Sequence, residues 1–179
     1  MKTSSAADGR DSILEMRCSW GIIHIVARDG SVVSCKLPEL RSEPSAPFRW
    51  ERVKHRAVSP NDAKTLKAAE RFVKSVLKGQ PVKPPAFVIP PATPFTLRVW
   101  RALQSIEPGC TVEYGELASR IGRAKGSRAV GRACGTNPLP LFIPCHRVLP
   151  KDGSLGGFTG GLPWKRLLLE RENAARPSS

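Results

Sequence analysis

The stretch GELASRIGRAKGSRAVGRAC, residues 115–134, decides the fold of the second half of the chain. It predicts two short helices, residues 115–121 and 127–134, joined by the glycine-containing turn 122–126. This is the length and composition of a helix-turn-helix unit. Two helices joined in this way are also an ordinary packing motif, so a DNA-binding role depends on charge and on the neighbouring residues.

Basic side chains gather between residues 120 and 132 of this unit, a span without an acidic residue: Arg120, Arg123, Lys125, Arg128 and Arg132. The whole chain of 179 residues has 29 Lys and Arg against 15 Asp and Glu, a net charge of +14 that its two halves share equally. Such an excess favours a polyanionic partner, with nucleic acid first. From charge alone, a solvated helix face explains the cluster about equally well.

A second informative stretch is Ile143-Pro144-Cys145-His146-Arg147-Val148, which places a cysteine and a histidine in a short apolar segment fixed by proline. A free thiol has a pKa of about 8.5, so it is a weak nucleophile at neutral pH until a neighbouring base or positive charge favours the thiolate. His146 and Arg147 could supply both. The string therefore indicates chemistry at sulfur.

The five cysteines are an odd number and widely spaced, and the N-terminal residues include no apolar signal segment. We therefore expect reduced thiols in an intracellular protein. No stretch approaches the roughly 20 apolar residues of a membrane span. No membrane contact is expected.

The first half of the chain predicts a small antiparallel sheet with a turn at Asp29-Gly30. Strand-forming residues are frequent in three segments: 13–18, 22–26 and 31–37. The proline-rich stretch 38–60 is a connection, within which three residues could add an edge strand: Phe48, Trp50 and Val53.

A helix should follow, capped by Ser59, opened by Pro60 and ended at Gly79, with one apolar face against the sheet. Six prolines make residues 80–94 a linker to a second, largely helical part. There, four residues at helical spacing predict a helix that Pro108-Gly109 closes: Phe95, Val99, Leu103 and Ile106. A last helix is expected near residues 163–172.

The C-terminal motifs resemble one known family, the O6-alkylguanine-DNA alkyltransferases, or methylated-DNA–protein-cysteine methyltransferases. The resemblance runs in order through nearly all of residues 93–172. Its motifs are Thr93-Pro94-Phe95, Val99-Trp100, Thr111, Tyr114-Gly115-Glu116-Leu117-Ala118, Arg128-Ala129-Val130-Gly131, Asn137-Pro138, Pro144-Cys145-His146-Arg147-Val148 and Gly160-Gly161-Leu162.

The resemblance implies an α+β fold: an N-terminal ribonuclease-H-like α/β domain with a small antiparallel sheet, residues 12–90, and a mostly helical C-terminal domain of winged-helix type, residues 91–173. Residues 1–11 and 174–179 are expected to be tails. It also implies the reaction, in which an alkyl group on O6 of guanine in duplex DNA passes irreversibly to the protein's own cysteine. Each molecule would act once.

The resemblance assigns the chemistry residue by residue. Cys145 is the nucleophile, His146 takes the thiol proton through a water, and Glu172 orients the imidazole. Asn137 organises the turn before the active-site segment. Tyr114 donates to N3 of the departing guanine; the alternative, a tyrosine that only packs in the core, fits poorly because this is the only tyrosine of the chain.

By resemblance, the second helix of the helix-turn-helix unit contacts DNA. By resemblance Arg128 enters from the minor groove and fills the gap left by the extruded nucleotide; a simple phosphate contact is the alternative. Small residues Ser127, Ala129 and Gly131 allow close approach. The remaining expected DNA contacts are Thr111, Lys125 and Arg132.

The resemblance also describes the substrate pocket. The carbonyls of Cys145 and Val148 would accept the exocyclic amine of guanine, and Pro140 and Phe158 would sandwich the ring. Phe158 stands where the family commonly has tyrosine. Thr159 stands where a small residue, often serine, assists O6, and its methyl group would narrow the pocket.

No cofactor is expected. Some family members hold zinc in the N-terminal domain, but only three scattered candidates occur here, without a paired spacing: Cys18, His24 and Cys35. The expected partner is double-stranded DNA containing O6-alkylguanine, with O4-alkylthymine as an open question. A monomer would suffice, in the cytoplasm or nucleoid, or in the nucleus of a eukaryote.

Three other functions stand beside this one. A lesion-binding protein that flags damage without repair is disfavoured by Cys145. A transcriptional regulator would need a sensor module, which the sequence does not contain. A cysteine hydrolase would need an oxyanion hole and water access, for which the sequence gives no sign.

Overall fold

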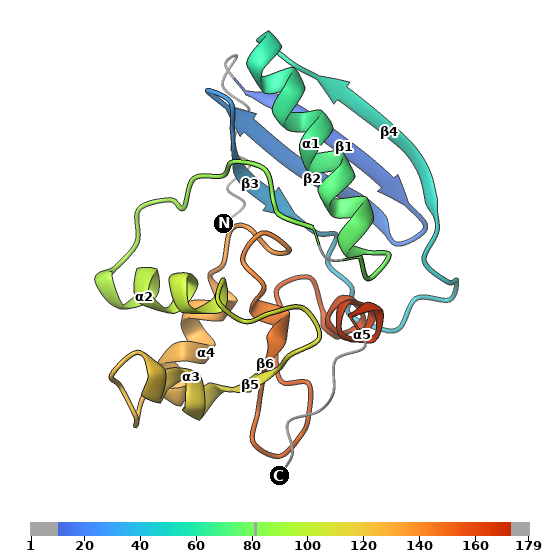
Figure 1. Ribbon diagram of the computed structural model, residues 1–179. Coiled ribbons are helices and arrows are strands. Elements are labelled where there is room, and N and C mark those ends of the chain that lie inside the picture. The colour runs from blue at the N-terminus through green and yellow to red at the C-terminus, as the bar shows by residue number, and fades with distance from the viewer. Residues whose placement is uncertain (1–10, 81, 173–179) are drawn as a thin grey trace, which may run out of the picture.

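Alternation of apolar and polar residues builds the sheet of the N-terminal half. The computed structural model describes residues 11–80 and 82–172. Its four antiparallel strands lie in the order β3-β2-β1-β4 (Figure 1). Their bounds are β1 Ser12–Cys18, β2 Gly21–Arg28, β3 Ser31–Lys36 and β4 Trp50–Arg56. In β1, Leu14, Met16 and Cys18 face the core and the residues between them do not.

The three predicted strands are confirmed, and so is the edge strand expected around Trp50. It forms β4, which pairs with β1 along the outer edge of the sheet. The expected tails fall outside the described residues, apart from Asp11.

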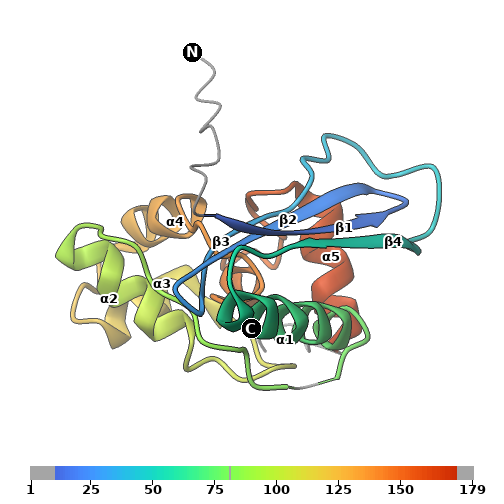
Figure 2. The ribbon, with the colours of Figure 1, turned by 90° about the horizontal axis from the view of Figure 1, so that it is seen from above.

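One helix covers the sheet. Helix α1, Pro60–Val76, lies along one face of the strands (Figure 2). As predicted, Ser59 caps it, since its side chain accepts from the backbone N–H of Asp62 at 3.1 Å. The buried Asp62 carboxylate then accepts from the Ser12 hydroxyl at 2.9 Å and from the Gly30 N–H at 2.8 Å. One carboxylate therefore ties the helix start to β1 and to the β2–β3 turn.

The proline-rich linker is more than a connection, because part of it pairs with the sheet. Val32 in β3 donates to Ala86 and accepts from Val88, both at 2.9 Å. Phe87 lies opposite Val32 as a parallel bridge. Prolines are compatible with such an edge position because only alternate backbone groups are bonded there.

The C-terminal half is mostly helical, with α2 Pro94–Leu103, α3 Tyr114–Arg120, α4 Ser127–Gly135 and α5 Leu162–Arg171. The helix-turn-helix unit is confirmed as α3 and α4. A short parallel pair joins β5, Val112–Glu113, to β6, Val148–Leu149. Between α4 and β6, a single 3-10 turn, η1, spans Cys145–Arg147. The helix expected to reach Ile106 ends at Leu103, and the next three residues continue as tight turns.

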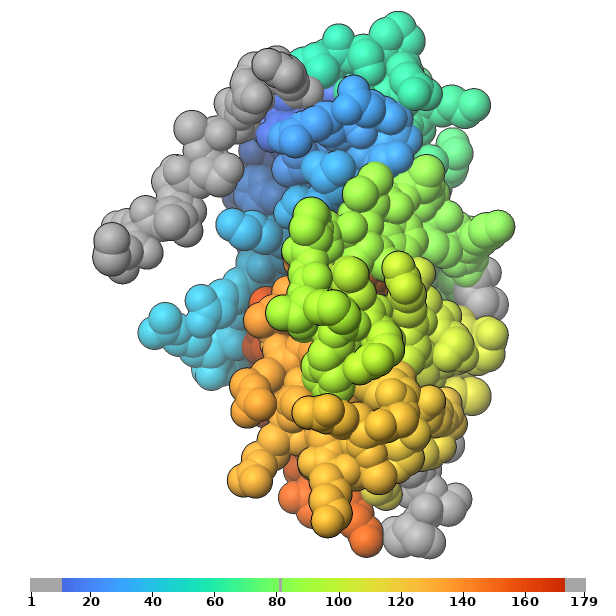
Figure 3. Space-filling model, turned by 90° about the vertical axis from the view of Figure 1, so that its left-hand side faces the viewer, coloured from blue at the N-terminus to red at the C-terminus, as the bar shows by residue number. Residues whose placement is uncertain are grey.

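The strands and the orange α4 lie toward opposite ends of the molecule in Figure 3, with the green segment after α1 between them. Buried residues of both halves nevertheless form one continuous hydrophobic cluster. Trp164 in α5 links the halves: its indole N–H donates to the Pro38 carbonyl at 2.9 Å, and its ring packs edge-on against Trp20 and Phe48.

Gly161, which opens α5, is required at this contact. Its φ is 98°, and a Cβ atom there would lie 1.9 Å from the Leu40 carbonyl oxygen. The connection between β3 and β4 can therefore approach α5 only at a glycine. The structure is a mixed α+β fold, and the division at residues 90 and 91 stays a prediction.

Candidate active site

The Cys145 sulfur is held in place by an asparagine from the turn after α4. Cys145 opens η1 and is 4% exposed. The Asn137 amide donates to the Cys145 sulfur at 3.1 Å and to the Ile143 carbonyl at 2.8 Å, while its oxygen accepts from the Leu139 N–H at 3.0 Å. Asn137 therefore fixes both the course of the chain toward Cys145 and the position of the sulfur.

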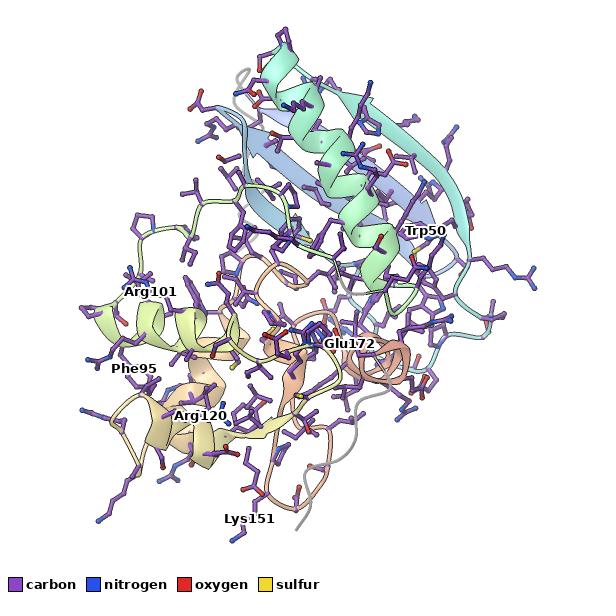
Figure 4. The ribbon with its side chains drawn as sticks, viewed as in Figure 1. Trp50, Phe95, Arg101, Arg120, Lys151 and Glu172 are labelled. Carbon is purple, nitrogen blue, oxygen red and sulfur yellow. The ribbon has the colours of Figure 1, made fainter. Side chains whose placement is uncertain are left out.

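Behind Cys145 lies a buried group of three charged or titratable side chains, from η1 and the end of α5. His146 Nε2 is 3.0 Å from Glu172 Oε1. Arg147 donates to both oxygens of Glu172, at 3.0 and 2.8 Å, and also to the Ile106 carbonyl at 2.5 Å. Glu172 lies near the centre of the molecule in Figure 4, whereas Arg120 and Lys151 lie toward its edge.

The charges of this group fix the tautomer of His146. Burial alone would raise the pKa of Glu172, but hydrogen bonds from His146 and Arg147 lower it to about 2, so Glu172 is ionised. Burial lowers the pKa of His146, against the opposing effect of Glu172, so the imidazole is neutral. A carboxylate can only accept, so Nε2 carries the hydrogen. Nδ1 is the free base, and it has no hydrogen-bond partner within the described residues.

Cys145 is a thiol at rest. Burial raises its pKa, while the hydrogen bond from Asn137 and the charge of Lys165 oppose this effect. The sequence suggested that Arg147 would favour the thiolate, but the guanidinium is bonded to Glu172 instead. A thiolate must therefore form when the substrate is present, by proton transfer to a base.

A cavity of about 990 Å³ opens over the sulfur, and we call it the Cys145 cavity. The cavity is lined by the candidate nucleophile, by basic side chains and by aromatic side chains. The residues that matter below are Tyr114, Arg128, Cys134, Cys145, Phe158 and Thr159. Ser127, Gly131 and Arg132 also line it, so the first turns of α4 form one wall.

Tyr114 lies at the start of α3 with its ring next to Gly131, where a Cβ atom would come within 3.8 Å of it. Burial, with smaller effects of Cys134 and Cys145, raises the pKa of Tyr114 to about 12. The hydroxyl therefore stays protonated at neutral pH and is available as a proton donor.

Several expected residues lie elsewhere. Pro140 is buried and does not line the Cys145 cavity. Lys125 is exposed on the turn between α3 and α4, and Thr111 lies just before β5. Ala129 is half-buried on α4. The Thr159 hydroxyl donates to the Gly135 carbonyl at 3.1 Å, which occupies the hydrogen expected to reach O6.

Lys165 was missed by the sequence reasoning. It is fully buried, and its Nζ donates to the Val148 carbonyl at 2.7 Å and lies 5.9 Å from the centre of the Tyr114 ring. Burial lowers its pKa to about 8. The sequence does indicate that Lys165 is buried, because it shares the inward face of α5 with Leu168 and Leu169. The Val148 carbonyl was expected to accept from the exocyclic amine of guanine, but in the structure it already accepts from Lys165.

A metal site has no support in the described part of the chain, where no group of three or more His, Cys, Asp or Glu side chains could hold an ion. Cys18 and Cys35 are buried in the sheet, and His24 faces Glu15. Within the same residues, no helix is long and apolar enough to cross a membrane.

Comparison with known proteins gives the family. The model of the 6-O-methylguanine DNA methyltransferase DNA-binding domain matches residues 94–174. The methylated-DNA–protein-cysteine methyltransferase of Haemophilus influenzae is 52% identical over 83 residues, 46% of either protein. The chain thus spans about half the length of the curated relatives it matches. A solved O6-methylguanine DNA methyltransferase of Methanococcus jannaschii is 30% identical, with 88% of this chain and 92% of that one covered and a TM-score of 0.59.

This chain belongs to the O6-methylguanine-DNA methyltransferase family. Among solved members of the family, the Mycobacterium tuberculosis protein OGT in complex with DNA has a TM-score of 0.71 at 29% identity, with 89% of this chain and 91% of that one covered. The structural match includes the N-terminal sheet, which contains none of the sequence motifs that suggested the family.

Proposed function

We propose that this protein repairs DNA by moving an alkyl group from O6 of guanine to its own Cys145. One observation carries the proposal: a buried cysteine, backed by an imidazole and a carboxylate, lies in a cavity whose wall is a basic helix. The family and the solved relative in complex with DNA support duplex DNA as the partner.

Access to the sulfur requires that the damaged base leave the duplex. O6 is shielded inside the stack, and extrusion costs a few kcal/mol. Arg128 stands exposed at the start of α4 and on the wall of the Cys145 cavity. A side chain there can enter the duplex while the extruded base occupies the cavity beside it, so that the cost is offset by stacking and hydrogen bonds.

The transfer is an in-line displacement. The free Nδ1 of His146 takes the Cys145 proton through a water, and the ionised Glu172 stabilises the imidazolium. Sulfur forms a bond to the alkyl carbon as the bond from that carbon to O6 breaks. Tyr114 gives its proton to the departing guanine, which would otherwise leave as an anion.

The thioether product is not hydrolysed, so each molecule acts once, and every reacting group is a side chain of the protein. The reaction therefore needs no cofactor, and a monomer suffices. A genomic substrate supports a location in the cytoplasm or nucleoid, or in a eukaryotic nucleus. O4-alkylthymine is a candidate second substrate, since it presents the same alkyl–oxygen bond.

The test follows a labelled methyl group. The protein is incubated with duplex DNA that contains one O6-methylguanine with a labelled methyl carbon, and the label is located by peptide mapping. We expect one label per molecule, on Cys145, and none in the Cys145→Ser variant. The exposed cysteine Cys110 gives a matched control, since Cys110→Ser should react as the wild type does. Label on another residue, or more than one equivalent per molecule, would falsify the proposal.

A further inference from the structure

The Cys145 cavity contains a second thiol that the proposed reaction does not use. Cys134, in the last turn of α4, lines the same cavity and is 6% exposed. The charge of Cys145 raises the pKa of Cys134, and the charges of both thiols raise the pKa values of Lys165 and Tyr114. Two sulfurs and one phenol therefore line the cavity, and the buried ammonium group of Lys165 lies within electrostatic reach of all three.

We propose that Cys134 is a second alkyl acceptor for bifunctional groups, so that a 2-haloethyl group delivered on O6 of guanine ends as an ethylene bridge between Cys145 and Cys134. The inference rests on the proposed function, because Cys145 must accept the group first. It extends the substrate class from simple alkyl groups to those with a leaving group on the second carbon.

The first step is the one described above. Sulfur of Cys145 bonds to the carbon attached to O6, the carbon–oxygen bond breaks, the thiol proton goes to His146, and guanine leaves with the proton of Tyr114. The product on Cys145 is a 2-haloethyl thioether. It is itself an alkylating agent, because the thioether sulfur assists departure of the halide.

The second step removes that reactive group. Sulfur of Cys134 bonds to the halogen-bearing carbon, and the halide leaves with the electrons of the carbon–halogen bond. The Cys134 proton goes to the phenolate that Tyr114 became in the first step, which restores the tyrosine. His146 returns its proton to water, so the sum is two thiols and one haloethylguanine giving the bridged protein, guanine and hydrogen halide.

The electrostatics favour this order of events. Burial, with a smaller effect of a charge on Cys145, raises the pKa of Cys134 to about 12, and the charge of Lys165 opposes this rise. A thioether cannot become an anion, so after the first transfer no thiolate of Cys145 competes with that of Cys134 for the Lys165 ammonium group. Cys134 can therefore ionise beside Lys165 without repulsion from a second thiolate once Cys145 has reacted.

Proximity favours Cys134 over its competitors. The haloethyl group and Cys134 share one cavity, which gives the second thiol a high effective concentration. The competing nucleophiles are water, which would leave a hydroxyethyl group, and the bound DNA, which would become crosslinked to the protein. A bridge to Cys134 avoids that crosslink.

The experiment uses freshly prepared duplex DNA with one O6-(2-chloroethyl)guanine and maps the products by mass spectrometry. In the wild type we expect the Cys134 and Cys145 peptides joined by ethylene, without chlorine, and free DNA. Cys134→Ala and Cys134→Ser should instead give chloroethyl or hydroxyethyl Cys145 and protein–DNA crosslinks. Cys110→Ala should behave as the wild type.

Each product is counted as a fraction of the molecules alkylated on Cys145, so a slower variant remains comparable. Equal product fractions in the wild type and both Cys134 variants would overturn the inference, as would a wild type without bridged peptides. Failure of the proposed function gives a different result, since the methyl-labelled duplex would then leave Cys145 unlabelled.

Discussion

Lys165 is fully buried and forms no ion pair with an acid among the residues that the structure describes. Its only hydrogen bond there is to the Val148 carbonyl, a neutral group. An ammonium group in such a place costs stability, and proteins usually avoid it. Lys165 lies beside two thiols and a tyrosine, so in the proposed reaction its charge assists groups that must become anionic.

The charge of Lys165 gives a pH-dependent stability. Its pKa is about 8 in the folded protein against 10.5 when unfolded, so between these values the unfolded chain binds more protons. Stability should therefore rise with pH in this window, by up to about 3 kcal/mol. We compare the free energy of unfolding of the wild type with that of Lys165→Met, measured by urea denaturation. The difference between them should shift in favour of the wild type as the pH increases from 8 to 10.5. A difference that stays constant over this range would contradict the burial of a charged amine.

At the scale of elements, α4 has two tasks in the proposed reaction, because one end would meet DNA and the other end carries Cys134. Its first turn has an exposed arginine, and its inward residues Val130 and Ala133 pack in the core. The carbonyl of Ala133 also accepts from the Trp100 indole at 2.8 Å, which fixes α4 against α2. In the proposed complex, Arg128 is thus presented to DNA by a helix that is anchored along its length.

Arg128→Ala tests this arrangement. Losing the side chain that fills the duplex gap should lower the methyl transfer rate about ten- to hundredfold and make the affinities for damaged and undamaged duplex more alike. Arg120→Ala is the matched control, because the Arg120 guanidinium already bonds to Glu116 on its own helix at 2.6 Å. Single-turnover rates and binding titrations measure both effects. Equal losses in the two variants would indicate a general phosphate contact instead.

Elements with a clear period were predictable, and short or composite ones were not. The strands and α1 followed from alternation, the Ser59 cap and the Pro60 start. The pairing of β5 with β6 was not predicted, since two residues per strand show no period and the pairing joins segments far apart in the sequence. The site was predicted as a set of residues, but the orientation of Arg147 toward Glu172 depends on where α5 ends in space. The burial of Lys165 was not predicted, because a lysine on the apolar face of a helix is rare.

At the scale of the whole molecule, the sheet and the helical half share one core. α5 is the common element: Trp164 contacts the sheet half, Lys165 donates to the Val148 carbonyl near the two thiols, and Glu172 follows directly after the helix to bind His146. A change in the position of α5 would therefore disturb both the packing of the halves and the basicity of the site.

The Trp164→Phe variant tests the shared core. It removes the donor to the Pro38 carbonyl and should cost about 1–3 kcal/mol of unfolding free energy. Because the core is continuous, loss of sheet signal in circular dichroism and exposure of Cys145 to a thiol reagent should still occur at one denaturant concentration. Trp50→Phe, at the sheet edge, is the control and should cost less. Separate transitions in the wild type would mean that the halves unfold independently.

The burial of Cys145 also decides which reagents the protein ignores. Alkylating agents dissolved in water can reach the exposed Cys110, whereas Cys145 is almost fully buried on the wall of its cavity and held as a thiol. A molecule that reacts once is lost if a stray electrophile reaches it first. In the proposed reaction, the buried, protonated sulfur thus keeps the acceptor intact in the presence of the same chemicals that damage DNA, until an extruded base carries the alkyl group into the cavity.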